Sequence, residues 1–274
     1  MKGLVNDLEL LEPKSVRNAL ELMVQDGVVP LAGATDLFVA LNAGTLEGRR
    51  FLNLWSLGPL RRIAVQNGSL SIGALATYSE IIRSRLVRRH LPILVDAARE
   101  IGGVQIQNRG TLGGNVANAS PAGDTLPVLA VAEAVVVLQS VEGERRVPFT
   151  RFYTGYRKSV RRPDELITAL EISAAGTGQW FRKVGTRAAQ AISKVVMAAV
   201  RSPEPRVALG SVGPTVVRLP RTEAALGRGD IDAAVAELER EIHPIDDGRS
   251  SAEYRRAVAG NLLRRFWAET APVA

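Results

Sequence analysis

The chain has 274 residues, 46% of them hydrophobic and 23% charged, which is typical of a folded protein with a sizeable core and excludes a disordered chain. It contains no cysteine and two histidines, which excludes disulfides, thiolate metal sites, cysteine-ligated iron–sulfur clusters and a cysteine nucleophile. The net charge of +7 comes mostly from scattered arginines, and aromatic residues make up 5%, so the basic tract and stacking aromatics of a nucleic-acid binder are missing.

The first predicted elements are a helix, a strand, a second helix and a second strand. Apolar residues recur at helical spacing from Ser15 to Val24, with Ser15 as the N-cap. Residues 28–44 (VVPLAGATDLFVALNAG) predict a short strand, a glycine turn and a helix that begins near Thr35 or Asp36. Residues 51–55 (FLNLW) predict another strand.

The middle of the chain predicts two hairpins separated by helices. Residues 61–77 form the first hairpin, which turns at Asn67 and Gly68. Helical patterns follow over residues 79–88 and 92–101. Residues 126–149 predict a short helix and then a hairpin that turns at Glu142 and Gly143, and residues 164–172 (DELITALEI) predict a further strand.

A change of composition at residues 173–179 (SAAGTGQ) predicts a domain boundary. Beyond it, three segments read as strands and two as helices with acidic or hydroxyl starts and basic ends. The strands are 180–185, 206–212 and 215–220, and the helices are 230–242 and 251–266. Strands and helices are interspersed without a regular βαβ period, so the predicted fold class is α+β.

Two glycine-rich segments indicate a ligand. The first glycine stretch is residues 30–37 (PLAGATDL) and the second is residues 110–124 (GTLGGNVANASPAGD). Glycine allows a ligand to approach the backbone, and consecutive free N–H groups form an anion-binding concavity, so the two stretches together would bracket a diphosphate. The alternative is that each is a tight turn between packed elements.

The usual dinucleotide and nucleotide motifs are missing. There is no G-x-G-x-x-G after a first strand and no G-x-x-x-x-G-K-[ST], so neither a Rossmann fingerprint nor a P-loop is present. A phosphate-bearing ligand would therefore need a different cradle.

Five segments together carry a family resemblance. They are the first glycine stretch and the segments 106–124 (IQNRGTLGGNVANASPAGD), 155–167 (GYRKSVRRPDELI), 181–199 (FRKVGTRAAQAISKVVMAA) and 244–266 (PIDDGRSSAEYRRAVAGNLLRRF). In order and spacing they resemble the FAD-binding medium subunit of molybdenum hydroxylases, the xanthine dehydrogenase and carbon monoxide dehydrogenase family. The likeness spans nearly the whole chain, and the last two segments look closer to the xanthine dehydrogenase type.

The resemblance implies a fold of three parts. Two α/β lobes, residues 1–57 and 58–175, would clasp FAD in the fold shared with vanillyl-alcohol oxidase. A C-terminal lobe, residues 176–274, would hold a small, three-stranded antiparallel sheet with helices. FAD is then the cofactor of this chain, while the molybdenum cofactor and the [2Fe–2S] clusters belong to partner subunits, and no metal site is expected here.

The resemblance also implies which residues contact FAD. Both glycine stretches match the motifs that wrap its diphosphate and ribityl chain, while Ser120 and Asp124 match further contacts. Leu166 matches a hydrophobic residue near the adenine end, and Lys183 a lysine near the flavin. The residues matched in the two motifs are Leu31, Ala32, Gly33, Ala34, Thr35, Asp36, Leu37, Thr111, Gly113, Gly114 and Asn115.

Two positions need separate comment. Ala34 stands where the family more often has glycine, and a positive φ there would cost about 1 kcal/mol. Tyr156 matches a tyrosine that, in NAD-dependent relatives, lies near the nicotinamide site, so it marks a candidate electron-acceptor site. The alternative for Tyr156 is a core or hinge tyrosine.

The implied function is electron transfer, with no catalytic acid or base from the protein. A large molybdopterin-binding subunit would oxidise the substrate, a small [2Fe–2S] subunit would pass electrons to FAD, and the acceptor would be NAD+, a quinone or oxygen. The assembly expected is a dimer of heterotrimers, cytoplasmic, with no nucleic acid and no membrane span, since no segment approaches roughly 18 apolar residues. Two alternatives are a stand-alone flavoprotein oxidoreductase and a scaffold that has lost FAD.

Overall fold

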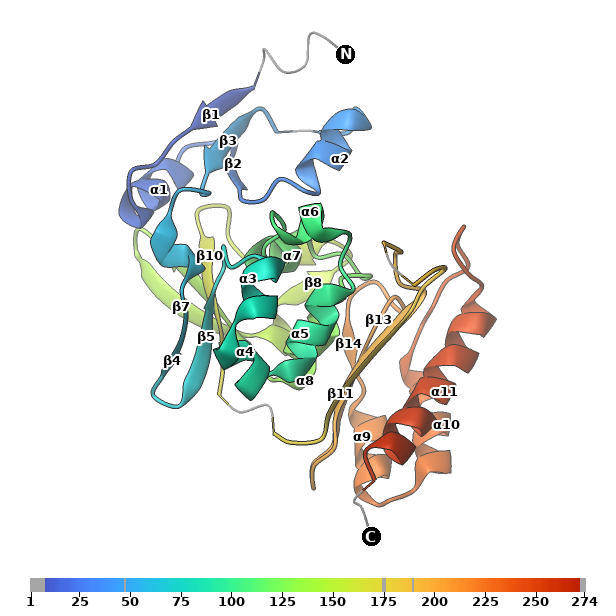
Figure 1. Ribbon diagram of the computed structural model, residues 1–274. Helices are drawn as coiled ribbons and strands as arrows, with labels where there is room; N and C mark the ends of the chain where they lie inside the picture. Colours follow the sequence, from blue (N-terminus) through green and yellow to red (C-terminus); the bar gives the residue numbers. More distant parts are fainter. Residues whose placement is uncertain (1–7, 47, 174–175, 189, 272–274) are drawn as a thin grey trace.

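The computed structural model describes residues 8–46, 48–173, 176–188 and 190–271. The chain folds into an N-terminal, a central and a C-terminal lobe, each built on its own sheet (Figure 1). Within these residues, no helix has the length and apolar content that crossing a membrane requires.

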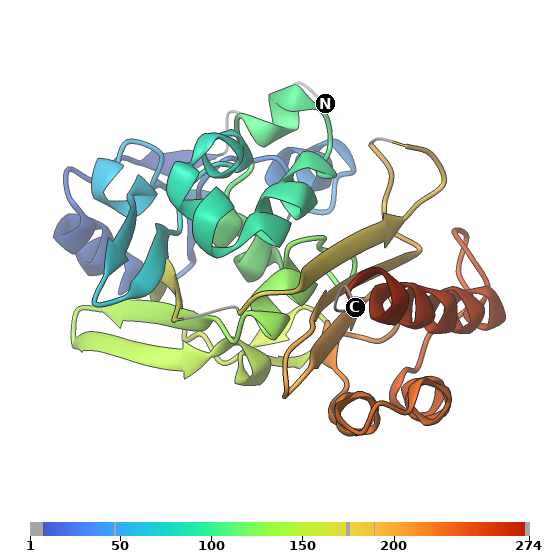
Figure 2. The same ribbon diagram turned by 60° about the horizontal axis from the view of Figure 1, so that its bottom comes forward.

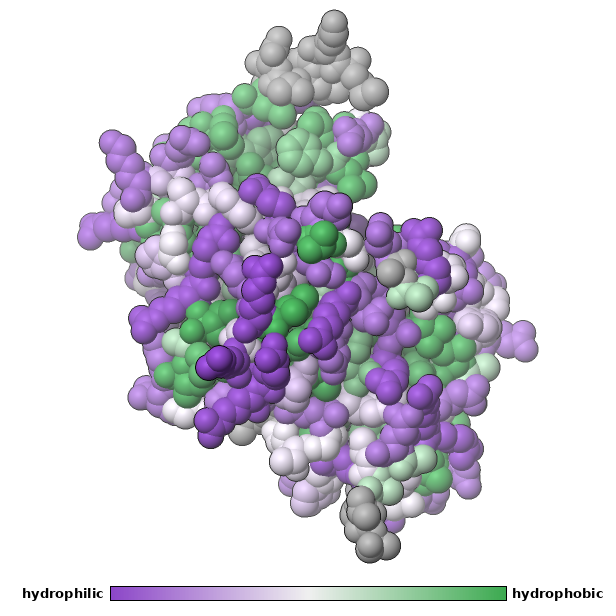
Figure 3. Space-filling model, viewed as in Figure 1, coloured by the Kyte–Doolittle hydropathy of each residue, from purple (hydrophilic) through white to green (hydrophobic). Residues whose placement is uncertain are grey.

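The N-terminal lobe is a three-stranded parallel sheet in the order β1-β3-β2, with two helices. Its strands are β1 (Glu9–Leu11), β2 (Val28–Leu31) and β3 (Arg50–Asn53), and its helices are α1 (Val16–Met23) and α2 (Leu37–Asn42). Helix α1 begins as predicted, because the Ser15 hydroxyl accepts a hydrogen bond from the Asn18 amide at 3.0 Å. Helix α2 buries no residue, and apolar surface gathers over it (Figure 3).

The central lobe is a five-stranded antiparallel sheet in the order β4-β5-β10-β6-β7, with helices packed beside it. Its strands are β4 (Ile63–Gln66), β5 (Ser69–Gly73), β6 (Val135–Ser140), β7 (Gly143–Pro148) and β10 (Leu166–Ile172), and β8 (Tyr153–Gly155) pairs with β9 (Lys158–Ser159). Its helices are α3 (Tyr78–Arg83), α4 (Arg85–His90), α5 (Pro92–Arg99), α6 (Val104–Gln107), α7 (Leu112–Asn118) and α8 (Leu126–Val131).

The predicted turns and helices of this lobe are partly correct. The hairpin turn at Asn67 and Gly68 is confirmed, and both residues have the positive φ, 50° and 79°, that a two-residue hairpin favours. The helical pattern predicted over residues 79–88 is confirmed except at Ser84, which is extended and divides it into α3 and α4; its hydroxyl caps α4 by accepting from the Val87 amide. The second hairpin turns one residue earlier than predicted, because Gly143 already pairs with Ser140.

The C-terminal lobe has a four-stranded antiparallel sheet, β11-β12-β13-β14, instead of the predicted three strands. Its elements are β11 (Gln179–Val184), β12 (Val195–Val200), β13 (Arg206–Gly210), β14 (Val217–Arg218), α9 (Pro220–Gly227), α10 (Ile231–Glu241) and α11 (Ala252–Glu269). Strand β12 was not predicted. Every residue in it is buried, so its sequence lacks the alternation of apolar and polar residues that marks a half-exposed strand.

The C-terminal sheet packs on both of its faces (Figure 2). On one face, Phe181, Val196 and Ala198 belong to the hydrophobic core of the central lobe. On the other, Trp180 and Met197 pack under helices α9 to α11. The predicted α+β class with a separate C-terminal sheet lobe is confirmed by this arrangement. The exact limits of the three parts stay predictions, and residues 174 and 175 of the predicted boundary lie outside the described residues.

Candidate functional site

A cleft of about 310 Å³ opens between the N-terminal and central lobes, within the size range of about 300–1,000 Å³ common for small-molecule sites. Both glycine stretches line it, from opposite sides of the lobe boundary. The predicted site residues that line the cleft are Leu31, Ala32, Gly33, Ala34, Thr35, Asp36, Leu37, Thr111, Gly113, Gly114, Asn115 and Leu166.

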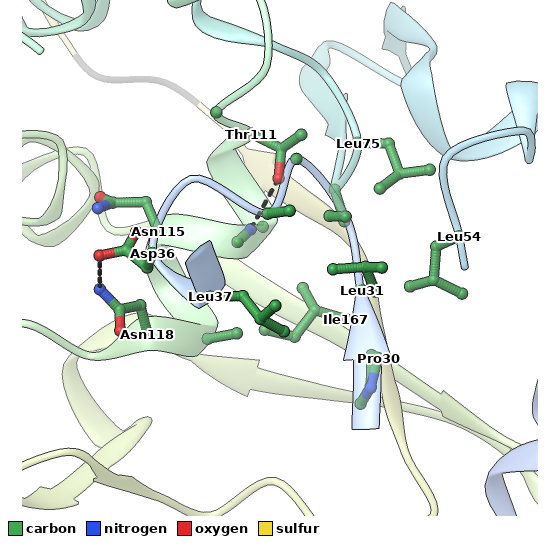
Figure 4. A pocket seen from close by; sticks show the side chains of 18 of the residues that line it. Pro30, Leu31, Asp36, Leu37, Leu54, Leu75, Thr111, Asn115, Asn118 and Ile167 are labelled. Atoms are coloured by element: carbon green, nitrogen blue, oxygen red, sulfur yellow. Dashed lines mark hydrogen bonds between the residues drawn. The ribbon is translucent and has the colours of Figure 1, made fainter. Parts of the chain in front are cut away.

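The cleft is apolar at one end and polar at the other (Figure 4). The labelled apolar side chains at the first end are Pro30, Leu31, Leu54, Leu75 and Ile167, and the polar ones at the second end are Asp36, Asn115 and Asn118. The apolar end is well packed from behind, because Leu54, Leu60, Leu75 and Leu166 also form a hydrophobic cluster with helix α1. A ligand that joins a flat apolar ring to a polar chain matches this division.

The first glycine stretch offers free backbone donors. Between β2 and α2, the amides of residues 32–36 donate no hydrogen bond to any described residue. Consecutive free N–H groups of this kind form a concavity that binds anions. Ala34 has a φ of 63°, in the left-handed region that favours glycine.

The two stretches touch at two points. The backbone at Gly33 lies so close to the Arg109 carbonyl that a Cβ on Gly33 would be 1.8 Å from its oxygen, so this position requires glycine. At the polar end, the Asn118 amide donates to the Asp36 carboxylate at 3.0 Å. These contacts join the lobes at the cleft.

The second glycine stretch has a different construction, because most of it is helix α7. The amides of residues 112–115 donate to Ala76 O, Ala74 O, the Thr111 hydroxyl and Thr111 O, at 2.9–3.1 Å. The expectation of free N–H groups is therefore wrong for residues 112–115. Its glycine serves packing instead, since a Cβ on Gly113 would lie 2.5 Å from the Ala74 Cβ.

Side chains of the second stretch face the cleft in place of its amides. Asn115 accepts a hydrogen bond from the Thr125 hydroxyl at 2.6 Å through its carbonyl oxygen. Its Nδ2 donates to no described residue, so it is available to a ligand. The Thr111 hydroxyl oxygen accepts from the Gly114 amide, which leaves its proton for a further acceptor.

Asp124 and Lys183 lie outside the cleft lining, buried between the central and C-terminal lobes. The Lys183 ammonium donates to Asp124 Oδ2 at 2.7 Å and to Glu100 O at 3.0 Å. Burial raises the pKa of Asp124 to about 6, and the attraction of Lys183 only partly offsets it. Asp124 Oδ1 is buried and has no partner, so a hydrogen-bond donor from a ligand would satisfy it.

Ser120 and Tyr156 also lie outside the cleft lining. The Ser120 hydroxyl accepts from the Ala122 amide within its own turn. The Tyr156 side chain is 60% exposed between β8 and β9, so the interpretation as a core tyrosine is wrong. Its neighbour Arg157 donates to Asn118 Oδ1 at 3.0 Å, and this places Tyr156 beside the polar end of the cleft.

The structure adds residues that sequence reasoning missed. Asn118 and Gly110 line the cleft, and their place inside the second glycine stretch was a usable signal. Tyr78 also lines it, although it lies far from both stretches in sequence and follows no motif. Within the described residues, no group of three or more His, Asp or Glu side chains is placed to hold a metal ion.

The chain is similar to two known protein families and to several known proteins. The family described as FAD binding domain in molybdopterin dehydrogenase matches residues 6–174, and the CO dehydrogenase flavoprotein C-terminal domain matches residues 180–270. The nicotinate dehydrogenase FAD-subunit of Eubacterium barkeri is 33% identical over 199 residues, covering 70% of this chain and 67% of that protein. The carbon monoxide dehydrogenase medium chain of Hydrogenophaga pseudoflava is 30% identical over 272 residues, covering 92% and 93%.

A solved structure is similar over nearly the whole chain. It is carbon monoxide dehydrogenase from Hydrogenophaga pseudoflava lacking the Mo-pyranopterin moiety of the molybdenum cofactor. Its TM-score is 0.90 at 27% identity, and the match covers 96% of this chain and 98% of that one. All three lobes and the cleft therefore belong to one known architecture.

Proposed function

The chain belongs to the family of FAD-binding medium subunits of molybdenum hydroxylases, and we propose that it carries electrons between an iron–sulfur partner and an electron acceptor. Its relatives are dehydrogenase subunits, so the chain is part of an oxidoreductase. One observation carries the proposal: residues 32–36, whose amides have no hydrogen-bond partner among the described residues, line a cleft that is apolar at its other end.

The residues present fit FAD. The amides of residues 32–36 would hold its diphosphate, with further hydrogen bonds from the Thr111 hydroxyl and Asn115 Nδ2. The apolar end, with Leu166 in its wall, would take the adenine ring, and the flavin ring would then lie toward the other end of the cleft. FAD would supply the redox chemistry, and the protein would set its position and exclude water from it.

The two carboxylates near the cleft fit other parts of FAD. A carboxylate beside a diphosphate would be repelled, so Asp36 and Asp124 would accept hydrogen bonds from hydroxyl or N–H groups of the cofactor. Asp124 Oδ1 has no partner in the protein, which supports this role. Lys183 would hold Asp124 in place, and Ser120 would shape the turn before it.

The partners follow from the family. We place the chain between a large molybdopterin-binding subunit and a small [2Fe–2S] subunit, in a dimer of heterotrimers in the cytoplasm. The final acceptor would be NAD+, a quinone or oxygen, and it would meet FAD beside the exposed Tyr156. The named relatives, a medium chain and an FAD-subunit, support an assembly of several chains.

The test is the visible spectrum of the chain purified alone and with its co-expressed partners. We expect flavin bands near about 370 and 450 nm and release of FAD on denaturation. Substrate should bleach these bands only when the partners are present. Bleaching without partners would indicate a stand-alone oxidoreductase, and a complex without flavin would contradict FAD binding.

A further inference from the structure

Tyr78 stands in the wall of the cleft and has no part in the FAD contacts above. It opens helix α3, lines the cleft and is 3% exposed. Its ring lies against the backbone of the second glycine stretch, where a Cβ on Gly110 would be 2.7 Å from the ring. The ring is therefore held firmly by packing.

The Tyr78 hydroxyl has no partner in the protein. It forms no hydrogen bond with any described residue, including Asp36 and Asp124. Tyr153, a half-buried tyrosine of the central lobe, donates to Val116 O at 2.9 Å. The Tyr78 hydroxyl oxygen is not among the fully buried atoms without a partner, so it is accessible from the cleft that Tyr78 lines and is free to bind a ligand there.

The charges near Tyr78 fix what kind of partner fits. Burial, together with the carboxylates of Asp36 and Asp124, raises the pKa of Tyr78 above its usual range. The phenol is therefore neutral and has a proton to donate. A further anion beside these two carboxylates would be repelled, so an uncharged acceptor oxygen fits best.

We propose that Tyr78 donates a hydrogen bond to a sugar-type hydroxyl of bound FAD, on its ribityl chain or its adenosine ribose, and so positions the cofactor. Such a hydroxyl accepts from Tyr78 and can also donate to a carboxylate. Asp36, at the polar end of the cleft (Figure 4), and Asp124 are the carboxylates available. The inference rests on the proposed function.

The test compares Tyr78→Phe with Tyr153→Phe in the full chain within its flavin-free complex. Tyr78→Phe keeps the ring that packs on Gly110 and removes only the hydroxyl. We expect FAD affinity, measured by flavin fluorescence titration, to fall about fivefold. The melting temperature of the flavin-free protein should not fall, because no protein hydrogen bond is lost.

The control variant, Tyr153→Phe, should change stability and leave FAD affinity nearly unaltered. Tyr153→Phe removes a hydrogen bond to Val116 O, so we expect a lower melting temperature and less than about a twofold change in FAD affinity. Loss of stability in flavin-free Tyr78→Phe, or equal FAD affinity of Tyr78→Phe and wild type, would overturn the inference. Failure of the wild type to bind FAD would instead contradict the proposed function.

Fragments of the cofactor locate the contact. If Tyr78→Phe weakens FMN binding and leaves ADP binding unchanged, the acceptor is on the ribityl chain. If it weakens ADP binding and leaves FMN unchanged, the acceptor is on the adenosine ribose. An equal loss with inorganic pyrophosphate would place the contact on the diphosphate and overturn the assignment.

Discussion

The two glycine stretches have similar compositions and opposite constructions. The first leaves the amides of residues 32–36 without partners and leads into α2, which buries no residue. In the second, the amides of residues 112–115 are all hydrogen-bonded to protein oxygens, and Leu112, Gly113 and Val116 of α7 are buried. Glycine in the first stretch exposes backbone to a ligand, whereas glycine in the second lets a helix pack closely.

The difference has a consequence for binding. A loop with free donors can adjust to a diphosphate, but it pays conformational entropy when it is ordered. A helix start with satisfied amides is already rigid and presents the Thr111 and Asn115 side chains in fixed positions. One wall of the cleft is therefore a loop that can adjust to the ligand, and the other wall is a rigid helix start.

Hydrogen exchange should show the largest contrast. In the flavin-free protein, we expect the amides of residues 112–115 to exchange at least about a hundredfold more slowly than those of residues 32–36, because only the former are hydrogen-bonded. Adding FAD should slow exchange at residues 32–36 and change residues 112–115 little. Equal exchange of the two groups without FAD would refute the contrast.

Gly33→Ala should break the junction between the two walls. Its Cβ would overlap the Arg109 carbonyl, so we expect about a hundredfold loss of FAD affinity, corresponding to about 3 kcal/mol. Gly58→Ala is the matched control, since its Cβ would meet nothing within 4 Å. Titration with FAD checks both, and unchanged affinity of Gly33→Ala would show that the junction yields easily.

Asp124, the last residue of the second glycine stretch, should make the free energy of unfolding depend on pH. Because the native pKa of Asp124 is about 6 and an unfolded aspartate has about 3.9, the native state binds more protons between these values. Stability from this group therefore rises as pH falls from 6 to 4, by at most about 1.4 kcal/mol per pH unit.

The double variant Asp124→Asn with Lys183→Met removes this titration and leaves no unpaired buried charge. Urea unfolding of both proteins from pH 4 to 7 checks the prediction. The difference between them should change with pH below 6 and become constant above about 7. Parallel profiles across the whole range would contradict the raised pKa.

Ala34→Gly should have the smallest effect. Relief of the positive φ favours the native state by about 1 kcal/mol, but glycine also gains about 0.4–1 kcal/mol of entropy in the unfolded chain, so stability should change by less than about 1 kcal/mol. Ala119→Gly, at a φ of 52° after α7, is the matched control. FAD affinity should change only for Ala34→Gly, and an equal change in both would contradict the contrast.

Much of the fold could be predicted because its signals are local. Ser15 as a helix cap and the Asn67-Gly68 turn are short-range patterns with direct physical causes. Strand β12 could not be predicted, because a strand buried on both faces reads as an unpatterned apolar run. The break at Ser84 was also missed, because serine is tolerated inside a helix as well as at its cap.

The cofactor class and the two segments that line the cleft follow from the amino-acid sequence, since motif residues at fixed spacing carry that information. Which stretch has free amides follows from the folded chain, because the partners of residues 112–113 come from Ala74 and Ala76 of a distant segment. It also placed Tyr78 in the wall and paired Asp124 with Lys183. Hydrogen-bond partners and burial depend on which segments meet in space, and no local pattern specifies them.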